Sequence, residues 1–217
     1  MTRAKVCGLT READVDAAVD AGADALGFLV DVPVDSPREI PVERAAELAA
    51  RVPPFVTTVL VTMQETPGRA LGLAADAGVD AIQLHGGLGV GDLAYVKANF
   101  DGALLAAVDA ANPEEAARVA GVVDAVLLDS LDAAGAGGTG ETADWPATAD
   151  VARDLDVPVL LAGGLTPDNV AEAVGVVAPY GVDVASGVEA RGGEKDNDAV
   201  RRFVRNAEHG DAEVVTP

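Results

Sequence analysis

Two hydrophobic patterns take turns along this 217-residue chain. Ala-rich stretches with apolar residues at helical spacing are separated by short apolar runs of the kind that forms a strand buried on both faces. At four places a helical stretch ends near a glycine, and an apolar run follows within a few residues. These places are 20–28, 76–84, 120–129 and 180–185.

Four more apolar runs lie between them, at 4–7, 55–61, 103–108 and 158–162, and helical stretches such as 12–21, 41–50, 66–77 and 113–120 intervene. Regular alternation of strand and helix predicts parallel strands with right-handed crossovers. A doubly wound open sheet has the same alternation. Eight units with no residues left for a second domain favour a single (β/α)8 TIM barrel over 1–206, followed by a frayed tail at 207–217.

Charge limits the partners that such a domain can have. The chain has 36 acidic and 15 basic residues, a formal net charge of -21. This surface would repel nucleic acid and anionic membranes, so we expect neither as a partner. Only three of the basic residues are lysines (Lys5, Lys97 and Lys195). This skew favours adaptation to concentrated salt over a merely acidic protein.

Cysteine usage and hydropathy indicate the compartment. Cys7 is the only cysteine, so no intramolecular disulfide can form. No apolar stretch approaches the ~20 residues of a membrane span, and the N-terminal residues show no apolar signal region. We therefore expect a soluble, cytoplasmic protein, and the sequence is compatible with both a monomer and a homodimer.

Reactive side chains of a TIM barrel lie at the carboxyl ends of its strands, and two predicted strands end on such residues. Cys7 ends the first run and Asp129 the sixth. A lone cysteine is often just a small buried hydrophobe, and Asp129 could simply cap a turn. The apolar run before Asp129 would, however, desolvate its carboxylate and raise its pKa, as a general acid requires.

Glycines after the last two strands indicate a phosphate site. Gly163 and Gly164 directly follow the seventh strand, and a helix start comes a few residues later. Ser186 and Gly187 repeat the arrangement after the eighth. Backbone N–H groups of such loops converge on anions, and these two loops bind phosphate in many barrels.

Two further residues are weaker candidates. Arg38, after the second strand, could bind a substrate carboxylate or be solvated. His85 lies at the end of the fourth predicted strand. It could be a catalyst, but a histidine in such a position is more often a packing residue. The Gly-rich stretch 133–140 lies between two units and is interpreted as an active-site loop. No metal-ligand spacing or nucleotide fingerprint occurs, so we expect neither metal nor cofactor.

These motifs, in this order, resemble the phosphoribosylanthranilate isomerase family along nearly the whole chain. The matching segments are Lys5-Val6-Cys7-Gly8-Leu9-Thr10, 22–28, Ser36-Pro37-Arg38, Gln83-Leu84-His85-Gly86, Leu127-Leu128-Asp129, 137–140, Asp144-Trp145, Ala162-Gly163-Gly164-Leu165, 182–189 and Lys195-Asp196.

The resemblance implies a TIM barrel that converts N-(5-phosphoribosyl)anthranilate into 1-(2-carboxyphenylamino)-1-deoxyribulose 5-phosphate in tryptophan biosynthesis. It implies that Asp129 is the general acid that opens the furanose ring and that Cys7, as thiolate, is the general base at C2. Arg38 would bind the anthranilate carboxylate, and Gly163, Gly164, Ser186 and Gly187 the phosphate. No cofactor is implied.

The chain departs from the family pattern at three places: no lysine occurs in 104–108, Glu141 replaces a common lysine, and Ala185 a usual serine. The lost positive charges could weaken binding of an anionic substrate. Two alternatives stay open. A related isomerase of histidine biosynthesis would share the phosphate loops but use two aspartates, and a non-catalytic barrel would need none of these groups.

Overall fold

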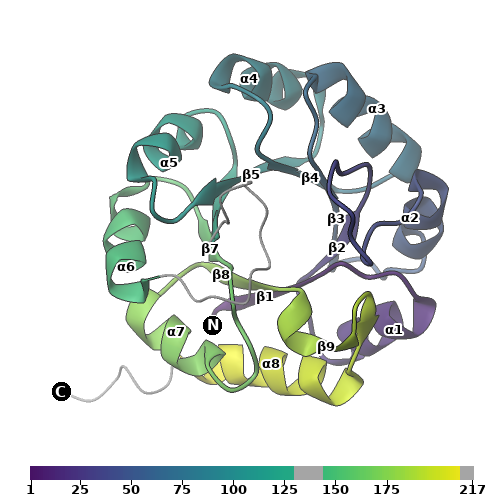
Figure 1. Ribbon diagram of the computed structural model, residues 1–217, viewed down its shortest axis with the longest axis vertical. Helices are drawn as coiled ribbons and strands as arrows, with labels where there is room; N and C mark the ends of the chain where they lie inside the picture. The colour runs from purple at the N-terminus through teal and green to yellow at the C-terminus, as the bar shows by residue number, and fades with distance from the viewer. Residues whose placement is uncertain (130–143, 211–217) are drawn as a thin grey trace.

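The computed structural model describes residues 1–129 and 144–210. Eight parallel strands close into a barrel in sequence order, and helices surround it (Figure 1). The strands are β1 (Arg3–Cys7), β2 (Ala25–Leu29), β3 (Thr57–Thr62), β4 (Ala81–His85), β5 (Ala103–Asp109), β6 (Ala125–Asp129), β7 (Val159–Leu161) and β8 (Gly181–Val184). The predicted TIM barrel is therefore confirmed.

The helices follow the strands in regular alternation. They are α1 (Glu12–Asp20), α2 (Val42–Ala49), α3 (Pro67–Ala77), α4 (Val90–Asn99), α5 (Pro113–Ala120), α6 (Trp145–Asp154), α7 (Val170–Val177) and α8 (Asn197–His209). None of the described helices is long and apolar enough to cross a membrane.

Local sequence sets where these helices begin and end. Pro113 lies in the first turn of α5, and the side chain of Asn112 accepts a hydrogen bond from the backbone N–H of Glu115. Asp196 caps α8 by accepting from two backbone N–H groups of its first turn. Gly78 ends α3 in the left-handed conformation, with φ +64°.

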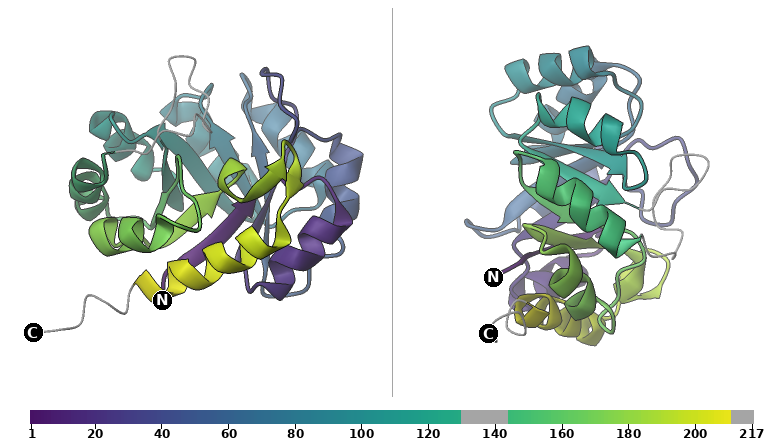
Figure 2. Two further views of the ribbon diagram at one scale, coloured as in Figure 1. Left: turned by 60° about the horizontal axis from the view of Figure 1, so that its bottom comes forward. Right: turned by 90° about the vertical axis from the view of Figure 1, so that its left-hand side faces the viewer.

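Closure of the barrel depends on pairing the first strand with the last. In the register of β1 and β8, Lys5 lies opposite Asp183 and Val6 opposite Val184. On the other side of β1, Cys7 lies opposite Gly27 of β2. The two ends of the chain thus meet in one seam, which α8 covers alongside β1 between α7 and α1 (Figure 2).

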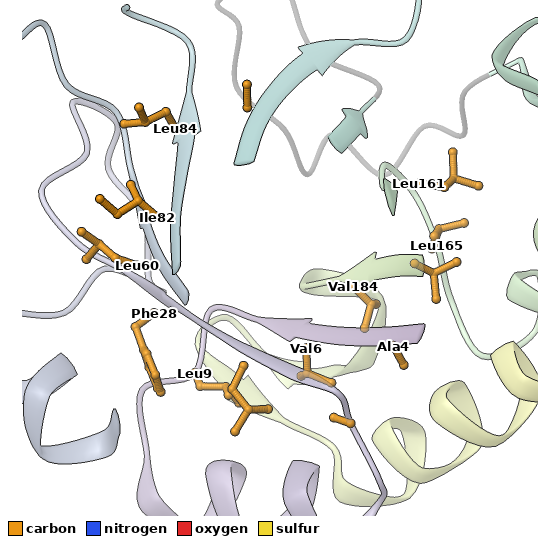
Figure 3. Packing of buried hydrophobic residues seen from close by; sticks show 14 of the residues in the cluster. Ala4, Val6, Leu9, Phe28, Leu60, Ile82, Leu84, Leu161, Leu165 and Val184 are labelled. Carbon is orange, nitrogen blue, oxygen red and sulfur yellow. The ribbon is translucent and has the colours of Figure 1, made fainter. Parts of the chain in front are cut away.

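Alternate residues of each strand face opposite sides, so the barrel has two apolar layers. The larger lies between strands and helices, and Figure 3 shows Phe28, Leu60 and Ile82 of this layer on the helix side of their strands. The smaller fills the barrel interior and includes Cys7, Val61 and Leu127. This inner layer fills the barrel beneath the carboxyl ends of the strands, where the active sites of TIM barrels lie.

Three features differ from the sequence prediction. Strand β3 begins at Thr57, because Phe55 lies in a turn after two prolines with φ +76° and is fully exposed. Helix α8 extends to His209, beyond the predicted start of the tail at residue 207, because Ala207 is buried. A hairpin of β9 (Glu189–Arg191) and β10 (Glu194–Lys195) follows the short 3-10 helix η1 (Ser186–Val188).

Candidate active site

A pocket opens at the carboxyl ends of the strands and receives polar side chains from four strands (β1, β4, β6 and β8) and the β2–α2 loop. The polar and ionisable members of its lining that matter here are Cys7, Arg38, Gln83, His85, Asp129 and Asp183. The structure thus brings together Cys7 and Asp129, which the sequence placed at two strand ends, and Arg38, which it placed in the loop after the second strand.

Cys7 ends β1 with its side chain in the barrel interior, 7% exposed. The strand beside it carries Gly27, where an added Cβ would lie 2.8 Å from the Cys7 Sγ. Any larger residue at this position would have to displace the sulfur. Glycine in β2 therefore makes the room in which the thiol faces the pocket.

The electrostatic surroundings of Cys7 are divided. Burial raises the pKa of the thiol, and the carboxylate of Asp183 adds to this effect. Lys5 and Lys195 act in the opposite direction by lowering the pKa. Because burial dominates, the pKa of Cys7 lies above its ordinary value, and the thiolate that a general base requires needs the two cations nearby.

A buried ion pair crosses the seam of the barrel below Cys7. The Nζ of Lys5 lies 2.7 Å from Oδ1 of Asp183, and the two side chains are 2% and 10% exposed. Burial by itself lowers the pKa of Lys5, but the negative charges of Asp183 and Cys7 outweigh it and raise the pKa. Lys5 is therefore a permanent cation inside the barrel at neutral pH.

Asp129 ends β6 and is 6% exposed. Its backbone carbonyl accepts a hydrogen bond from the N–H of Ala110, which ties the end of β6 to the start of the β5–α5 loop. The carboxylate lines the same pocket as Cys7. A group that can give a proton and a group that can take one therefore face a single space.

Arg38 lies in the β2–α2 loop and is bound by an acidic residue of the hairpin after β8. Its Nε and Nη2 donate to the two carboxylate oxygens of Glu189 at 2.8 and 2.9 Å. The Nζ of Lys195 donates to the same carboxylate at 3.0 Å and to the carbonyl of Ala185 at 2.9 Å. Although burial raises the pKa of Glu189, these two cations hold it below its ordinary value.

This network fixes the orientation of Arg38. A guanidinium has five N–H donors, and Glu189 uses two of them. The hairpin also packs on the loop that carries Arg38, because an added Cβ at Gly193 would lie 2.2 Å from the carbonyl oxygen of Pro37. The side chain of Arg38 held in this way lines the pocket.

The predicted phosphate loops lie next to each other. Gly163 and Gly164 both have positive φ, +85° and +63°, as the turn after β7 requires. At Gly187, after β8, an added Cβ would lie 1.9 Å from the carbonyl oxygen of Leu165. The two loops are thus in backbone contact. None of these loop glycines lines the pocket around Cys7. Ala185, the residue before Ser186, does line it.

Gln83 and His85 point into the barrel from β4 and line the pocket. Within the described part of the chain, Oε1 of Gln83 and Nε2 of His85 are buried without a hydrogen-bond partner. Burial lowers the pKa of His85, which favours the neutral ring at pH 7. The ring of His85 thus lines the pocket, and the packing role that the sequence favours for it stays a prediction.

Sequence reasoning missed four charged residues around the site, namely Lys5, Asp183, Glu189 and Lys195. A charged residue inside a run buried on both faces is a usable signal, and Lys5 and Asp183 each give it. Their pairing was not predictable, because 178 residues separate them. Residues 133–140 and Glu141 lie outside the described residues.

Metal ligands are absent from the part of the chain that the structure describes: no group of three or more His, Cys, Asp or Glu side chains could hold an ion.

Comparison with known proteins gives one consistent result. Residues 4–206 match the family model of N-(5'-phosphoribosyl)anthranilate isomerase. A Halobacterium salinarum protein named N-(5'-phosphoribosyl)anthranilate isomerase is 59% identical over 210 residues, covering 95% of this chain and 96% of its own.

Solved structures agree. Phosphoribosyl anthranilate isomerase from Thermotoga maritima is 35% identical with a TM-score of 0.85, covering 96% of this chain and 99% of its own. A phosphoribosyl anthranilate isomerase in complex with reduced 1-(o-carboxyphenylamino)-1-deoxyribulose 5-phosphate is 34% identical with a TM-score of 0.82, at the same coverage.

Proposed function

The chain belongs to the N-(5'-phosphoribosyl)anthranilate isomerase family, and we propose that Cys7 and Asp129 are the base and the acid with which it performs this isomerisation. The enzyme acts in tryptophan biosynthesis and converts N-(5-phosphoribosyl)anthranilate into 1-(2-carboxyphenylamino)-1-deoxyribulose 5-phosphate. The observation that supports this division of roles is that the two side chains line one pocket.

In the proposed first step Asp129 protonates the ring oxygen of the furanose. The C1–O bond breaks, and the anilino nitrogen supplies the electron pair that makes the open chain an iminium. The buried position of Asp129 suits a group that must carry a proton to a weakly basic oxygen.

In the second step Cys7, as thiolate, removes the proton at C2. The electron pair of the C–H bond moves toward C1 and neutralises the iminium, which gives an enolamine. Tautomerisation to the ketone completes the Amadori rearrangement. The order of events leaves Asp129 as carboxylate and Cys7 as thiol, so proton return through the pocket or solvent resets the enzyme.

Substrate binding is assigned to groups at two ends of the site. Arg38, held by Glu189, would bind the anthranilate carboxylate with donors that Glu189 does not use. Gly163, Gly164, Ser186 and Gly187 would bind the phosphate. In the described residues, the N–H groups of Gly163 and Gly164 donate no hydrogen bond within the protein, which suits an anion site.

Two further parts of the proposal concern the solvent and the cell compartment in which the protein works. The charge of -21 and the scarcity of lysine support adaptation of the surface to concentrated salt. We place the protein in the cytoplasm, where a lone buried thiol such as Cys7 stays reduced.

Asp129→Asn tests the proposed acid. An amide accepts hydrogen bonds, so the variant should fold and bind reduced 1-(o-carboxyphenylamino)-1-deoxyribulose 5-phosphate, but it cannot supply the proton that opens the ring. We expect kcat to fall ~10² to 10⁴-fold in a fluorescence assay of substrate consumption, with loss of one limb of the pH profile of kcat/KM. Normal turnover with an unaltered profile would show that the acid is another residue.

A further inference from the structure

Lys5 is a charged side chain in the interior of the barrel, where TIM barrels are usually filled by branched apolar residues. It belongs to the same face of β1 as Cys7, two residues further along the strand, so their Cα atoms are about 6.6 Å apart. The Nζ of Lys5 donates a hydrogen bond to Oδ1 of Asp183, its partner on the adjacent strand β8, at 2.7 Å. Cys7 and Asp183 both line the pocket above it.

A buried ion pair is costly to form, and well-packed apolar residues often replace one without loss of stability. Stability alone therefore does not explain why β1 carries Lys5 and β8 carries Asp183. A thiolate at Cys7 would be a third buried charge beside this pair. A nearby cation stabilises the thiolate relative to the neutral thiol. Lys5 is the cation on its own strand face.

We propose that Lys5 is a positioning residue for the general base: its ammonium, anchored on Asp183 inside the barrel, supplies the positive charge that stabilises the Cys7 thiolate. The proposal rests on the assignment of Cys7 as the base. It gives the Lys5–Asp183 pair a role in the reaction, since Asp183 holds the ammonium inside the barrel and keeps it charged.

The other charged or titratable groups near Cys7 do not stabilise its thiolate as Lys5 does. They come from the strands, loop and hairpin around the pocket and are Asp183, His85, Asp129, Arg38, Glu189 and Lys195. The carboxylate of Asp183 opposes a thiolate, Asp129 carries a proton in its proposed role as acid, and His85 is favoured as neutral. Glu189 binds both Arg38 and Lys195 and so offsets their charge. Among the cations that lower the pKa of Cys7, Lys5 has the largest effect.

Alkylation of the thiolate measures the proposed effect directly, because Cys7 is the only cysteine of the chain. The rate of reaction with iodoacetamide is followed against pH for the full-length protein, for Lys5→Met and for the double variant Lys5→Met/Asp183→Asn. Lys97→Met is the matched control, since it removes the ammonium of a surface ion pair with Asp124.

We expect Lys5→Met to slow alkylation at pH 8 by about tenfold or more, because each unit of pKa increase lowers the thiolate fraction tenfold. The double variant should lie between Lys5→Met and the unchanged protein. It also removes Asp183, which raises the pKa of Cys7, but by less than Lys5 lowers it. Lys97→Met should react at the unchanged rate.

If the single variant unfolds because Asp183 is left unpaired, the double variant still decides the question, since it replaces a buried pair by two uncharged residues. Alkylation of either variant at or above the unchanged rate would overturn the proposal. A purely structural role for Lys5 would shift the melting temperature but leave the alkylation pKa in place.

The same variants separate this proposal from the assignment of the base. If Cys7 is the base, the limb of the kcat/KM profile that reports it should move with the alkylation pKa in Lys5→Met. If the alkylation pKa moves and the limb does not, Lys5 acts on Cys7 as proposed, and the base is another residue.

Discussion

Arg38 and Glu189 form a bidentate ion pair across the rim of the pocket, with Nε to Oε1 at 2.8 Å and Nη2 to Oε2 at 2.9 Å. The two residues come from the loop after β2 and the hairpin after β8, on either side of β1. Their pairing fixes the side chain of Arg38 in the lining of the pocket.

Arg38→Met should affect substrate binding more than turnover. Loss of a charge-assisted contact to the substrate carboxylate removes about 1.5–3 kcal/mol, which corresponds to a rise in KM of roughly 10- to 100-fold. Steady-state kinetics measure this. Arg44→Met, which removes an arginine of the exposed face of α2, should leave KM unchanged. An unchanged KM in Arg38→Met would leave Arg38 as a structural residue.

Glu189 should make stability depend on pH in the acid range. Because its folded pKa lies below its ordinary value, its ion pairs stabilise the protein fully above about pH 4.3, and this contribution is lost as pH falls through the folded pKa. The free-energy difference between the unchanged protein and Glu189→Gln should therefore be constant near neutrality and shrink below about pH 4.3.

Urea unfolding across pH 3 to 7 measures that difference. Glu47→Gln, at an exposed ion pair with Arg44, is the control and should show a small difference at every pH. A Glu189→Gln difference that is equally large at pH 3 and pH 7 would contradict the assigned role of its ionised form.

Cys7→Ser should abolish most of the activity and leave the fold intact. A serine hydroxyl is far less acidic than a thiol, so kcat should fall at least ~10²-fold, the usual contribution of a general base. Melting temperature and binding of reduced 1-(o-carboxyphenylamino)-1-deoxyribulose 5-phosphate should change little. Near-normal turnover of the serine variant would assign the base elsewhere.

Gly187→Ala should disturb the two loops assigned to the phosphate. The added Cβ would lie 1.9 Å from the carbonyl oxygen of Leu165, so the backbone must move, at a cost of about 1–3 kcal/mol. We expect a lower melting temperature together with a higher KM. The control is Gly175→Ala on the exposed face of α7, where a Cβ meets no atom within 4 Å and should be neutral or stabilising.

Salt should stabilise the protein. With 36 acidic against 15 basic residues, most carboxylates have no cation to pair with, and their mutual repulsion acts on the folded state. The Debye length falls from about 10 Å at 0.1 M to about 3 Å at 1 M. The melting temperature should rise over this range in thermal unfolding, and a flat response would contradict adaptation to salt.

The strand–helix alternation, the barrel and the strand ends that carry Cys7 and Asp129 were predictable from sequence. They depend on local patterns: hydrophobic periodicity, glycines at helix ends and the rule that barrel chemistry lies at the carboxyl ends of strands. Arg38 and the glycines of the last two loops were also identified, through their positions after predicted strands. Their assignment to substrate carboxylate and phosphate stays a prediction.

Partnerships between distant residues were decided only by the tertiary structure. Lys5 meets Asp183 because closure places β8 beside β1 in a register that puts the two residues opposite each other. Glu189 reaches Arg38 because a hairpin after β8 folds over the loop after β2. Local periodicity determines which residues of a strand face the barrel interior. A charge buried there is tolerated only when an oppositely charged residue lies beside it, and for Lys5 this happens only when β1 pairs with β8. The local pattern of either strand does not specify that pairing.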